Sequence, residues 1–120
     1  MIEILVVEDS PSERELISRY LRGNGYQVIG VGSGQEALSK AIQKKPHVII
    51  TDVVMPEMNG FELCRSLKRN PQTRTIPIIA CTSKNQELDR LWGMKQGIEV
   101  YLTKPFTQEQ IVRAVELVAS

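Results

Sequence analysis

Short segments rich in β-branched residues alternate along the chain with segments that repeat apolar residues at helical spacing. The strand-like segments are residues 2–7, 27–31, 48–51, 78–81 and 100–103. After each of them, apolar residues recur three or four positions apart, as in Ala37, Leu38, Ala41 and Ile42, which is typical of one face of a helix. Parallel strands need long crossover connections, and helices supply them. The alternation therefore predicts an α/β fold, with a parallel sheet covered by helices on both faces.

The strand-like segments are of two kinds, and the difference predicts their order in the sheet. The first, third and fourth segments contain the runs ILVV, VII and IIAC, and consecutive apolar positions are typical of strands buried on both faces. The second and fifth segments are more mixed, so we place them at the edges. With right-handed crossovers, this favours a doubly wound three-layer sandwich with strand order 2-1-3-4-5. In such sheets ligands bind beyond the carboxyl ends of the strands, at the point where the winding direction reverses.

Polar residues that can cap a helix stand before each predicted helix, with an acid or amide three positions later, as in a capping box. They are Ser10, Ser33, Asn59, Ser83 and Thr107. Residues 23–25 (GNG) and Gly97 are typical of helix ends. Gly93 lies inside the fourth predicted helix and weakens it by up to about 1 kcal/mol. These features predict both ends of most helices.

Length, charge and cysteine content narrow the class of protein. With 120 residues, 42% of them hydrophobic, we expect residues 1–120 to form a single domain. The net charge of +1 argues against nucleic acid or a polybasic membrane surface as the main partner. No apolar run approaches the roughly 20 residues of a membrane span, and no signal peptide follows Met1. Cys64 and Cys81 lack metal-site spacing, so we expect reduced thiols in a cytoplasmic protein without membrane insertion.

Acidic residues follow two strands that the predicted order makes neighbours. Glu8 and Asp9 come directly after the first strand, and Asp52 comes after the third. Three carboxylates at one edge of a sheet repel one another unless a cation lies among them. Oxygen ligands of this kind suit Mg²⁺, or Mn²⁺ in its place. The alternative is that Glu8 and Asp9 are only solvated acids that the dipole of a nearby helix favours.

Two further strand ends bring complementary chemistry to the same edge. Thr82 and Ser83 follow the fourth strand, and Lys104 follows the fifth. A hydroxyl and an ammonium then face the carboxylates, which fits phosphoryl transfer to a carboxylate. Asp52 would attack phosphorus, while Lys104 and Thr82 contact the phosphoryl oxygens and a divalent cation offsets charge repulsion. Such chemistry depends mainly on positioning and electrostatics.

Four sequence motifs point to one family. VVEDS, DVVMPEMNG, IIACTS and YLTKPF occur in the order and spacing of response-regulator receiver domains, and the whole chain resembles a receiver of the CheY type. The resemblance implies the flavodoxin-like (βα)5 fold, a cis bond between Lys104 and Pro105, and Asp52 as the phosphoacceptor. It implies that Mg²⁺ is held by Glu8, Asp9, Asp52 and the backbone carbonyl of Val54. It also implies phosphoryl contacts from Thr82 and Lys104, and a switch made by Thr82 and Tyr101.

The resemblance also implies partners and an output. A receiver accepts its phosphoryl group from a histidine kinase or phosphotransfer domain, catalysing its own phosphorylation and slow dephosphorylation, and it is not a metabolic enzyme. We expect output to a downstream protein through a face formed by the fourth helix, fifth strand and fifth helix, with Trp92 and Tyr101 on that face. We expect a monomer, with phosphorylation-linked dimerisation as the alternative. Residues 82–97 resemble stand-alone receivers of twitching-motility systems, the PilG/PilH type, although Trp92 could instead be an ordinary packing residue.

Alternative functions share the fold class. A flavin-binding module would need Gly-rich or hydroxyl-rich sequence after the first strand, where this chain has Glu8 and Asp9. An aspartyl-phosphate phosphohydrolase would carry a second Asp two residues after Asp52, where this chain has Val54. A phosphorylation-independent interaction domain would not need Lys104 or the acidic residues. Because Val54 offers no side-chain hydrogen bond to orient water, we expect slower autodephosphorylation than in fast chemotaxis receivers.

Overall fold

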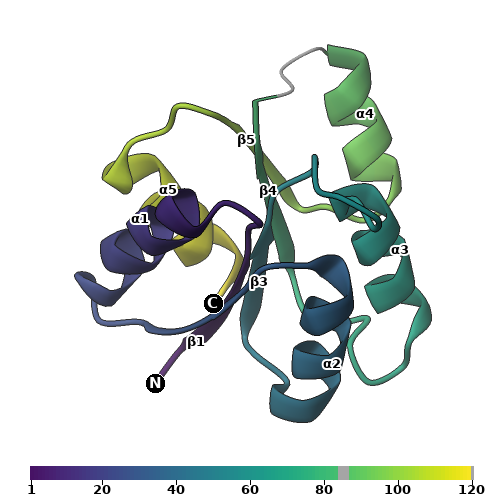
Figure 1. Cartoon of the computed structure of the whole chain (residues 1–120), viewed down its shortest axis with the longest axis horizontal. Coiled ribbons are helices and arrows are strands. Elements are labelled where there is room, and N and C mark those ends of the chain that lie inside the picture. Colours follow the sequence, from purple (N-terminus) through teal and green to yellow (C-terminus); the bar gives the residue numbers. More distant parts are fainter. Residues whose placement is uncertain (84–86, 120) are drawn as a thin grey trace.

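The computed structural model describes residues 1–83 and 87–119, and within these ranges it has one parallel sheet (Figure 1). The sheet order is β2-β1-β3-β4-β5, as predicted, with β2 and β5 at the edges. The strands are β1 (Glu3–Val7), β2 (Gln27–Val31), β3 (Val48–Thr51), β4 (Ile78–Thr82) and β5 (Val100–Thr103). β4 is one residue longer than predicted, because Thr82 pairs with Thr103 of β5.

Helices cover both faces of the sheet and complete the three layers. They are α1 (Pro11–Arg22), α2 (Gly34–Lys44), α3 (Gly60–Arg69), α4 (Glu87–Lys95) and α5 (Gln108–Val118). Figure 1 shows α1 and α5 on one face and α2, α3 and α4 on the other. The pairs α1–α5 and α2–α3 pack side by side, and α4 packs against β5. None of the described helices is both long enough and apolar enough to cross a membrane.

Buried side chains alternate between the two faces of the central strands. Ile4 and Val6 of β1 belong to the core under α1 and α5. Leu5 and Val7 belong to the core under α2 and α3. The same alternation occurs in β3 and β4, so the consecutive apolar runs fill two separate cores. This confirms the reasoning that placed these three strands inside the sheet.

The helix starts follow the predicted capping pattern only in part. Full capping boxes occur at α3, between Asn59 and Glu62, and at α5, between Thr107 and Gln110. At α1 and α2, Ser10 and Ser33 cap the helix, but the acid three residues later bonds elsewhere. The prediction of a reciprocal bond is wrong there, because the carboxylates find competing donors. The predicted box that begins at Ser83 includes residues 84–86, which lie outside the described residues.

Glycines end two helices as predicted. Gly25 after α1 and Gly97 after α4 have φ of +88° and +100°, where a side chain would be strained. The bond between Lys104 and Pro105 is cis, as the resemblance implied.

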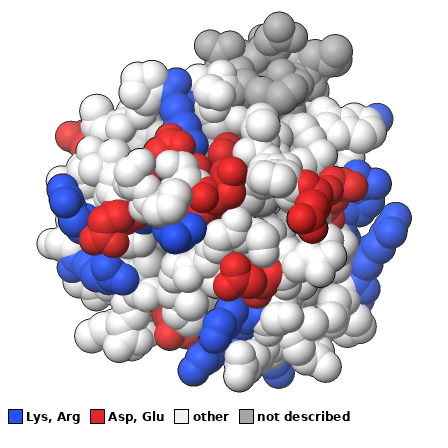
Figure 2. Space-filling model, viewed as in Figure 1, with Lys and Arg blue, Asp and Glu red and all other residues white. Residues whose placement is uncertain are grey.

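The face of the molecule seen in Figure 2 carries acidic and basic side chains in small interspersed groups.

Candidate functional site

Three carboxylates meet at the carboxyl edge of the sheet. Glu8 follows β1 and Asp52 follows β3, and these strands are neighbours whose last residues pair in register. With Asp9, they offer oxygen atoms that all lie within 4.8 Å of one another. Glu8 is 1% exposed and Asp52 8% exposed, whereas Asp9 is open to solvent. The structure thus brings together the acidic residues that the sequence predicted, with two of them buried.

The orientation of Asp52 is set by the backbone around it. The Val53 N–H donates to Asp52 Oδ1 at 2.8 Å, and the Thr51 hydroxyl donates to the Asp52 carbonyl at 2.9 Å. The N-terminus of α3 closes on this segment through the Gly60 N–H, which donates to the Val53 carbonyl at 2.9 Å. A Cβ on Gly60 would lie only 2.3 Å from the Asp52 carbonyl oxygen. Gly60 therefore permits a close approach of the two backbone segments that a side chain at this position would prevent.

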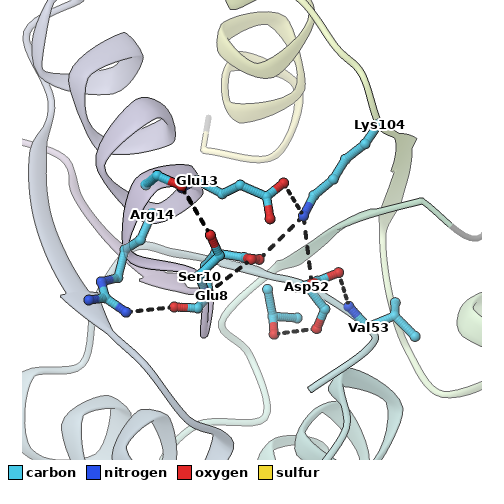
Figure 3. Close-up of polar contacts among 9 residues, drawn as sticks. Glu8, Ser10, Glu13, Arg14, Asp52, Val53 and Lys104 are labelled. Carbon is cyan, nitrogen blue, oxygen red and sulfur yellow. Dashed lines mark hydrogen bonds and ion pairs between the residues drawn. The ribbon is translucent and has the colours of Figure 1, made fainter. Parts of the chain in front are cut away.

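Lys104 brings a positive charge into the carboxylates from β5 (Figure 3). Its backbone N–H donates to the Thr82 carbonyl at 2.7 Å, which ties the residue to the end of β4. Its Nζ lies 3.6 Å from Asp52 Oδ2 and 3.4 Å from Glu8 Oε2. The other oxygen of Asp52, Oδ1, is already held by the Val53 N–H. One oxygen of Asp52 is thus fixed by the backbone, while the other faces the ammonium.

The charges in the cluster perturb one another. Burial, and next the charge of Asp52, raise the pKa of Glu8 from 4.5 to about 8, although Lys104 opposes them. Burial alone would lower the pKa of Lys104, but the hydrogen bond to Glu13 and the charges of Asp52 and Glu8 outweigh it, so the pKa is raised. The Lys104 ammonium therefore offsets only part of the effect that burial and the charge of Asp52 have on the pKa of Glu8.

The donor set of the cluster fits a divalent cation. Carboxylate oxygens are the ligands that Mg²⁺ prefers, and the exposed Asp9 leaves room for the waters that Mg²⁺ keeps. The charge of Asp52 contributes to the raised pKa of Glu8, after burial, and a cation among the carboxylates would oppose both effects. Glu8, Asp9 and Asp52 are therefore the residues that could hold the ion. The predicted fourth ligand, the carbonyl of Val54, lies two residues beyond Asp52 and stays a prediction.

The predicted switch residues lie in the interior. Thr82 is fully buried at the end of β4, and Tyr101 of β5 is 5% exposed in the core under α2 and α3. Gly93 of α4 lies against the Tyr101 ring, where a Cβ would be 3.2 Å from Cδ2 and Cε2. The glycine that weakens α4 thus lets this helix pack closely on Tyr101. Tyr101 is thus buried in this conformation, and its assignment to a partner face stays a prediction.

Trp92 lies on the outside of α4. It is 49% exposed, and Leu91 and Met94 on the same helix are exposed as well. The alternative that Trp92 is an ordinary helix–sheet packing residue is therefore wrong. The reason is that α4 turns Gly93, not Trp92, toward the sheet.

Sequence reasoning missed one residue of the site. Glu13 was expected to cap α1, but its Oε1 lies 3.0 Å from Lys104 Nζ, the shortest of the ion pairs that Lys104 makes among the described residues. This hydrogen bond lowers the pKa of Glu13 despite its partial burial. The position of Glu13 in the sequence could have indicated this role, because the first turn of the helix that follows β1 lies over the switch point of the sheet. An acid in that turn was a candidate for the site.

The doubly wound sheet has the arrangement that the sequence predicted, with carboxylates and a lysine together at its switch point. Comparison with known proteins identifies the class. The family model of the response regulator receiver domain matches residues 4–116. The chain belongs to this family, and is a receiver domain of two-component response regulators.

Similar proteins include both curated sequences and solved structures. The chain is 40% identical to Protein PilH of Pseudomonas aeruginosa over 118 residues, which cover 98% of each chain. The chemotaxis protein CheY4 of Vibrio cholerae superposes with a TM-score of 0.93 at 35% identity, covering 98% of each chain. The receiver domain of the P. aeruginosa sensor histidine kinase PA1611, described with a magnesium ion in its active site cleft, has a TM-score of 0.91 at 31% identity, covering 98% of this chain and 97% of that one. The chain spans about half the length of several curated transcriptional regulators that it also matches.

Proposed function

We propose that Asp52 accepts a phosphoryl group from a histidine kinase or a phosphotransfer domain. The observation that carries this proposal is the position of Asp52 Oδ2, which faces the Lys104 ammonium at 3.6 Å inside a buried carboxylate cluster. In the reaction, a carboxylate oxygen of Asp52 bonds to phosphorus while the phosphorus–nitrogen bond of the donor phosphohistidine breaks. The departing imidazole takes up a proton. Lys104 and Thr82 stabilise the phosphoryl oxygens as their charge redistributes.

A divalent cation belongs to this proposal. Glu8, Asp9, Asp52 and the Val54 carbonyl would hold Mg²⁺, or Mn²⁺ in its place. When bound, the ion would offset the repulsion between the anionic nucleophile and the phosphoryl oxygens. The magnesium ion in the cleft of the PA1611 receiver domain supports this assignment. Autophosphorylation from small phosphodonors should therefore require the cation.

The direct test is the intact mass of the protein after incubation with phosphoramidate and Mg²⁺. Wild type should gain the mass of one phosphoryl group, and Asp52→Asn should gain none. Chelation of the metal should abolish the gain in wild type. A gain in both proteins, or in neither, would contradict Asp52 as the acceptor.

The output of the receiver should pass through the face formed by α4, β5 and α5. A shift of Thr82 toward the phosphoryl group would open space near Tyr101, and the Tyr101 ring packs directly under Gly93 of α4. Phosphorylation would thus bias a pre-existing equilibrium in α4 and change the surface that Trp92 offers to a downstream protein. Hydrogen exchange in α4 and β5 should differ between free and phosphorylated protein, and unchanged exchange there would argue against this route.

The phosphoryl group should be long-lived. Val54 has an exposed side chain that cannot hydrogen-bond a water near the phosphoryl group. We expect Val54→Asn to shorten the lifetime measured by loss of label from purified phosphoprotein. A lifetime of seconds in wild type that the substitution leaves unchanged would contradict this expectation.

The cellular role follows from the relatives only as a proposal. The likeness to PilH along nearly the whole chain supports a role in twitching motility. Two reduced, buried thiols, Cys64 and Cys81, are compatible with the cytoplasm, and we expect a monomer when unphosphorylated. Restoring twitching to a P. aeruginosa strain that lacks PilH would support the role, provided that Asp52→Asn does not restore it.

A flavin-binding function is not favoured. Such a module would bind a phosphate where Glu8 and Asp9 stand, and these carboxylates would repel it. The family match points to signalling instead.

A further inference from the structure

Among the described residues, Lys104 makes its shortest ion pair with Glu13, which lies beside the carboxylate cluster. Glu13 Oε1 lies 3.0 Å from Lys104 Nζ, compared with 3.4 Å for Glu8 Oε2 and 3.6 Å for Asp52 Oδ2. Glu13 belongs to the first turn of α1 and is not one of the three residues whose oxygens could share a metal ion. The lysine that faces the proposed phosphoacceptor is therefore bonded most closely to Glu13, which also interacts with the Glu8 side chain.

Glu13 is free to make this contact because it does not hold the start of α1. In a capping box its carboxylate would accept the N–H of Ser10, but that N–H donates to Glu8 Oε1 at 3.4 Å. The backbone of Glu13 remains fixed, since its own N–H donates to the Ser10 hydroxyl. Figure 3 shows the carboxylate of Glu13 turned toward Lys104. The helix start thus holds Glu13 in place while its carboxylate stays free of the capping role.

The pair lies on the solvent side of the buried cluster. The Glu13 side chain is 46% exposed, whereas that of Lys104 is 16% exposed. Both residues line a cleft of about 340 Å³ beside the cluster, together with Leu16 and Phe106 among others. Glu13 therefore has the freedom to swing away, which Glu8, buried beneath Lys104, does not have.

We propose that Glu13 is a positioning residue that holds the Lys104 ammonium on the α1 side of the site and so slows phosphoryl capture by Asp52. This inference rests on the proposed function of Asp52 and Lys104. A phosphoryl group needs the same ammonium that Glu13 occupies, so the Glu13 contact must loosen for Lys104 to move fully onto the phosphoryl oxygens. The negative charge of Glu13 also opposes an incoming anionic donor. Glu13 thus affects the rate at which the receiver is phosphorylated, and it takes no part in the step that forms the bond to phosphorus.

The test compares Glu13→Gln with Glu15→Gln. Glu15 is an exposed acid on the same helix, and it is not among the three carboxylates that contact Lys104. Both substitutions replace a glutamate by a glutamine and change the net charge equally, but only Glu13→Gln removes a contact with Lys104. The first measurement is the initial rate of phosphorylation by acetyl phosphate with Mg²⁺, followed by intact mass. The second is the rate of reductive methylation of the Lys104 amine in unphosphorylated protein, mapped by peptide mass. Asp52→Asn serves as the control for the acceptor.

Glu13→Gln should accelerate phosphorylation by about two- to fivefold, the factor expected for a partly exposed ion pair. It should also quicken methylation of Lys104, which a purely structural role of Glu13 would not do, while Glu15→Gln changes neither rate. An unchanged or slower phosphorylation rate in Glu13→Gln would overturn the inference. Equal acceleration in both variants would also overturn it, because general charge would then explain the effect. Phosphorylation of Asp52→Asn at the wild-type rate would instead show that the proposed acceptor is wrong.

Discussion

The helices α3 and α4 cover the same face of the sheet but are attached to it very differently. α3 begins with a full capping box and buries Phe61, Leu63, Cys64 and Leu67. In α4, among the side chains that the structure describes, Gly93 faces the core, while Leu91, Trp92 and Met94 are exposed. α3 is therefore held by large apolar side chains, and α4 rests on the sheet partly through a glycine.

The difference in packing fits the position of each helix relative to Asp52 and Tyr101. The N-terminus of α3 places Gly60 against the backbone of Asp52, so a movement of α3 would disturb the proposed phosphoacceptor. α4 lies over Tyr101, at the other end of the proposed switch. Elements with few buried apolar contacts can be displaced at low free-energy cost. Among the side chains that the structure describes, α3 is thus the more firmly packed helix. It lies at the proposed site of chemistry, whereas α4 lies at the proposed output face.

The largest effect is expected when a buried side chain of α3 is truncated. Leu63 is fully buried, so Leu63→Ala should lower the free energy of unfolding by about 2–5 kcal/mol, because the substitution removes apolar contacts and leaves a cavity. Urea titration followed by circular dichroism measures the change. A loss below about 1 kcal/mol would mean that α3 is held no more firmly than an exposed helix.

The thiol of Cys64 tests the same helix without mutation. Burial raises the pKa of Cys64 from 9.0 to about 11, only partly offset by Lys68, so the thiolate fraction at pH 8 falls about 100-fold. Alkylation by iodoacetamide should be slower in native protein by at least that factor, and should quicken as the pH rises toward 11. Protein unfolded in guanidinium provides the control. Rapid labelling of native Cys64 at pH 8 would show that α3 opens readily.

Loss of the α3 cap should have a smaller effect. The Asn59 side chain accepts the Glu62 N–H at 2.9 Å, and Asn59→Ala should cost about 1 kcal/mol of unfolding free energy by removing this bond. Asn59→Asp retains an acceptor and should stay close to wild type. If both variants lose the same amount, the cap bond itself is not the cause.

The smallest effect is expected in α4. Leu91 is exposed, so Leu91→Ala should change the unfolding free energy by no more than about 0.5 kcal/mol. The same urea titration used for Leu63→Ala gives the comparison directly. If truncation of Leu91 costs as much as truncation of Leu63, the contrast between the two helices fails.

The sequence predicted the sheet and the acidic cluster for the same physical reason. Strands with apolar residues at consecutive positions must be central, and the carboxyl ends of central parallel strands converge, which brought Glu8 and Asp52 together. The position of the Lys104 ammonium among several carboxylates was harder to predict. The Glu13 carboxylate could bond either to the Ser10 N–H or to the Lys104 ammonium, and the spacing of residues along the chain does not determine which.

The sequence also did not predict which aromatic side chains are buried. Tyr101 and Trp92 were both assigned to a partner face, yet one is in the core and the other is on the surface. The outcome depends on how α4 is rotated over β5, with Gly93 inward. The sequence did not show that Gly93 would lie against the Tyr101 ring while Trp92 points outward.

The exposure of Trp92 has a practical consequence for experiments on this protein. It is the only tryptophan in the chain, and it is half-exposed on the outside of α4. The tryptophan fluorescence of the protein, excited where the three tyrosines absorb little, therefore comes from one indole at a known place. Changes in emission wavelength or quenching by iodide will report on the surroundings of α4 in real time, without any attached dye.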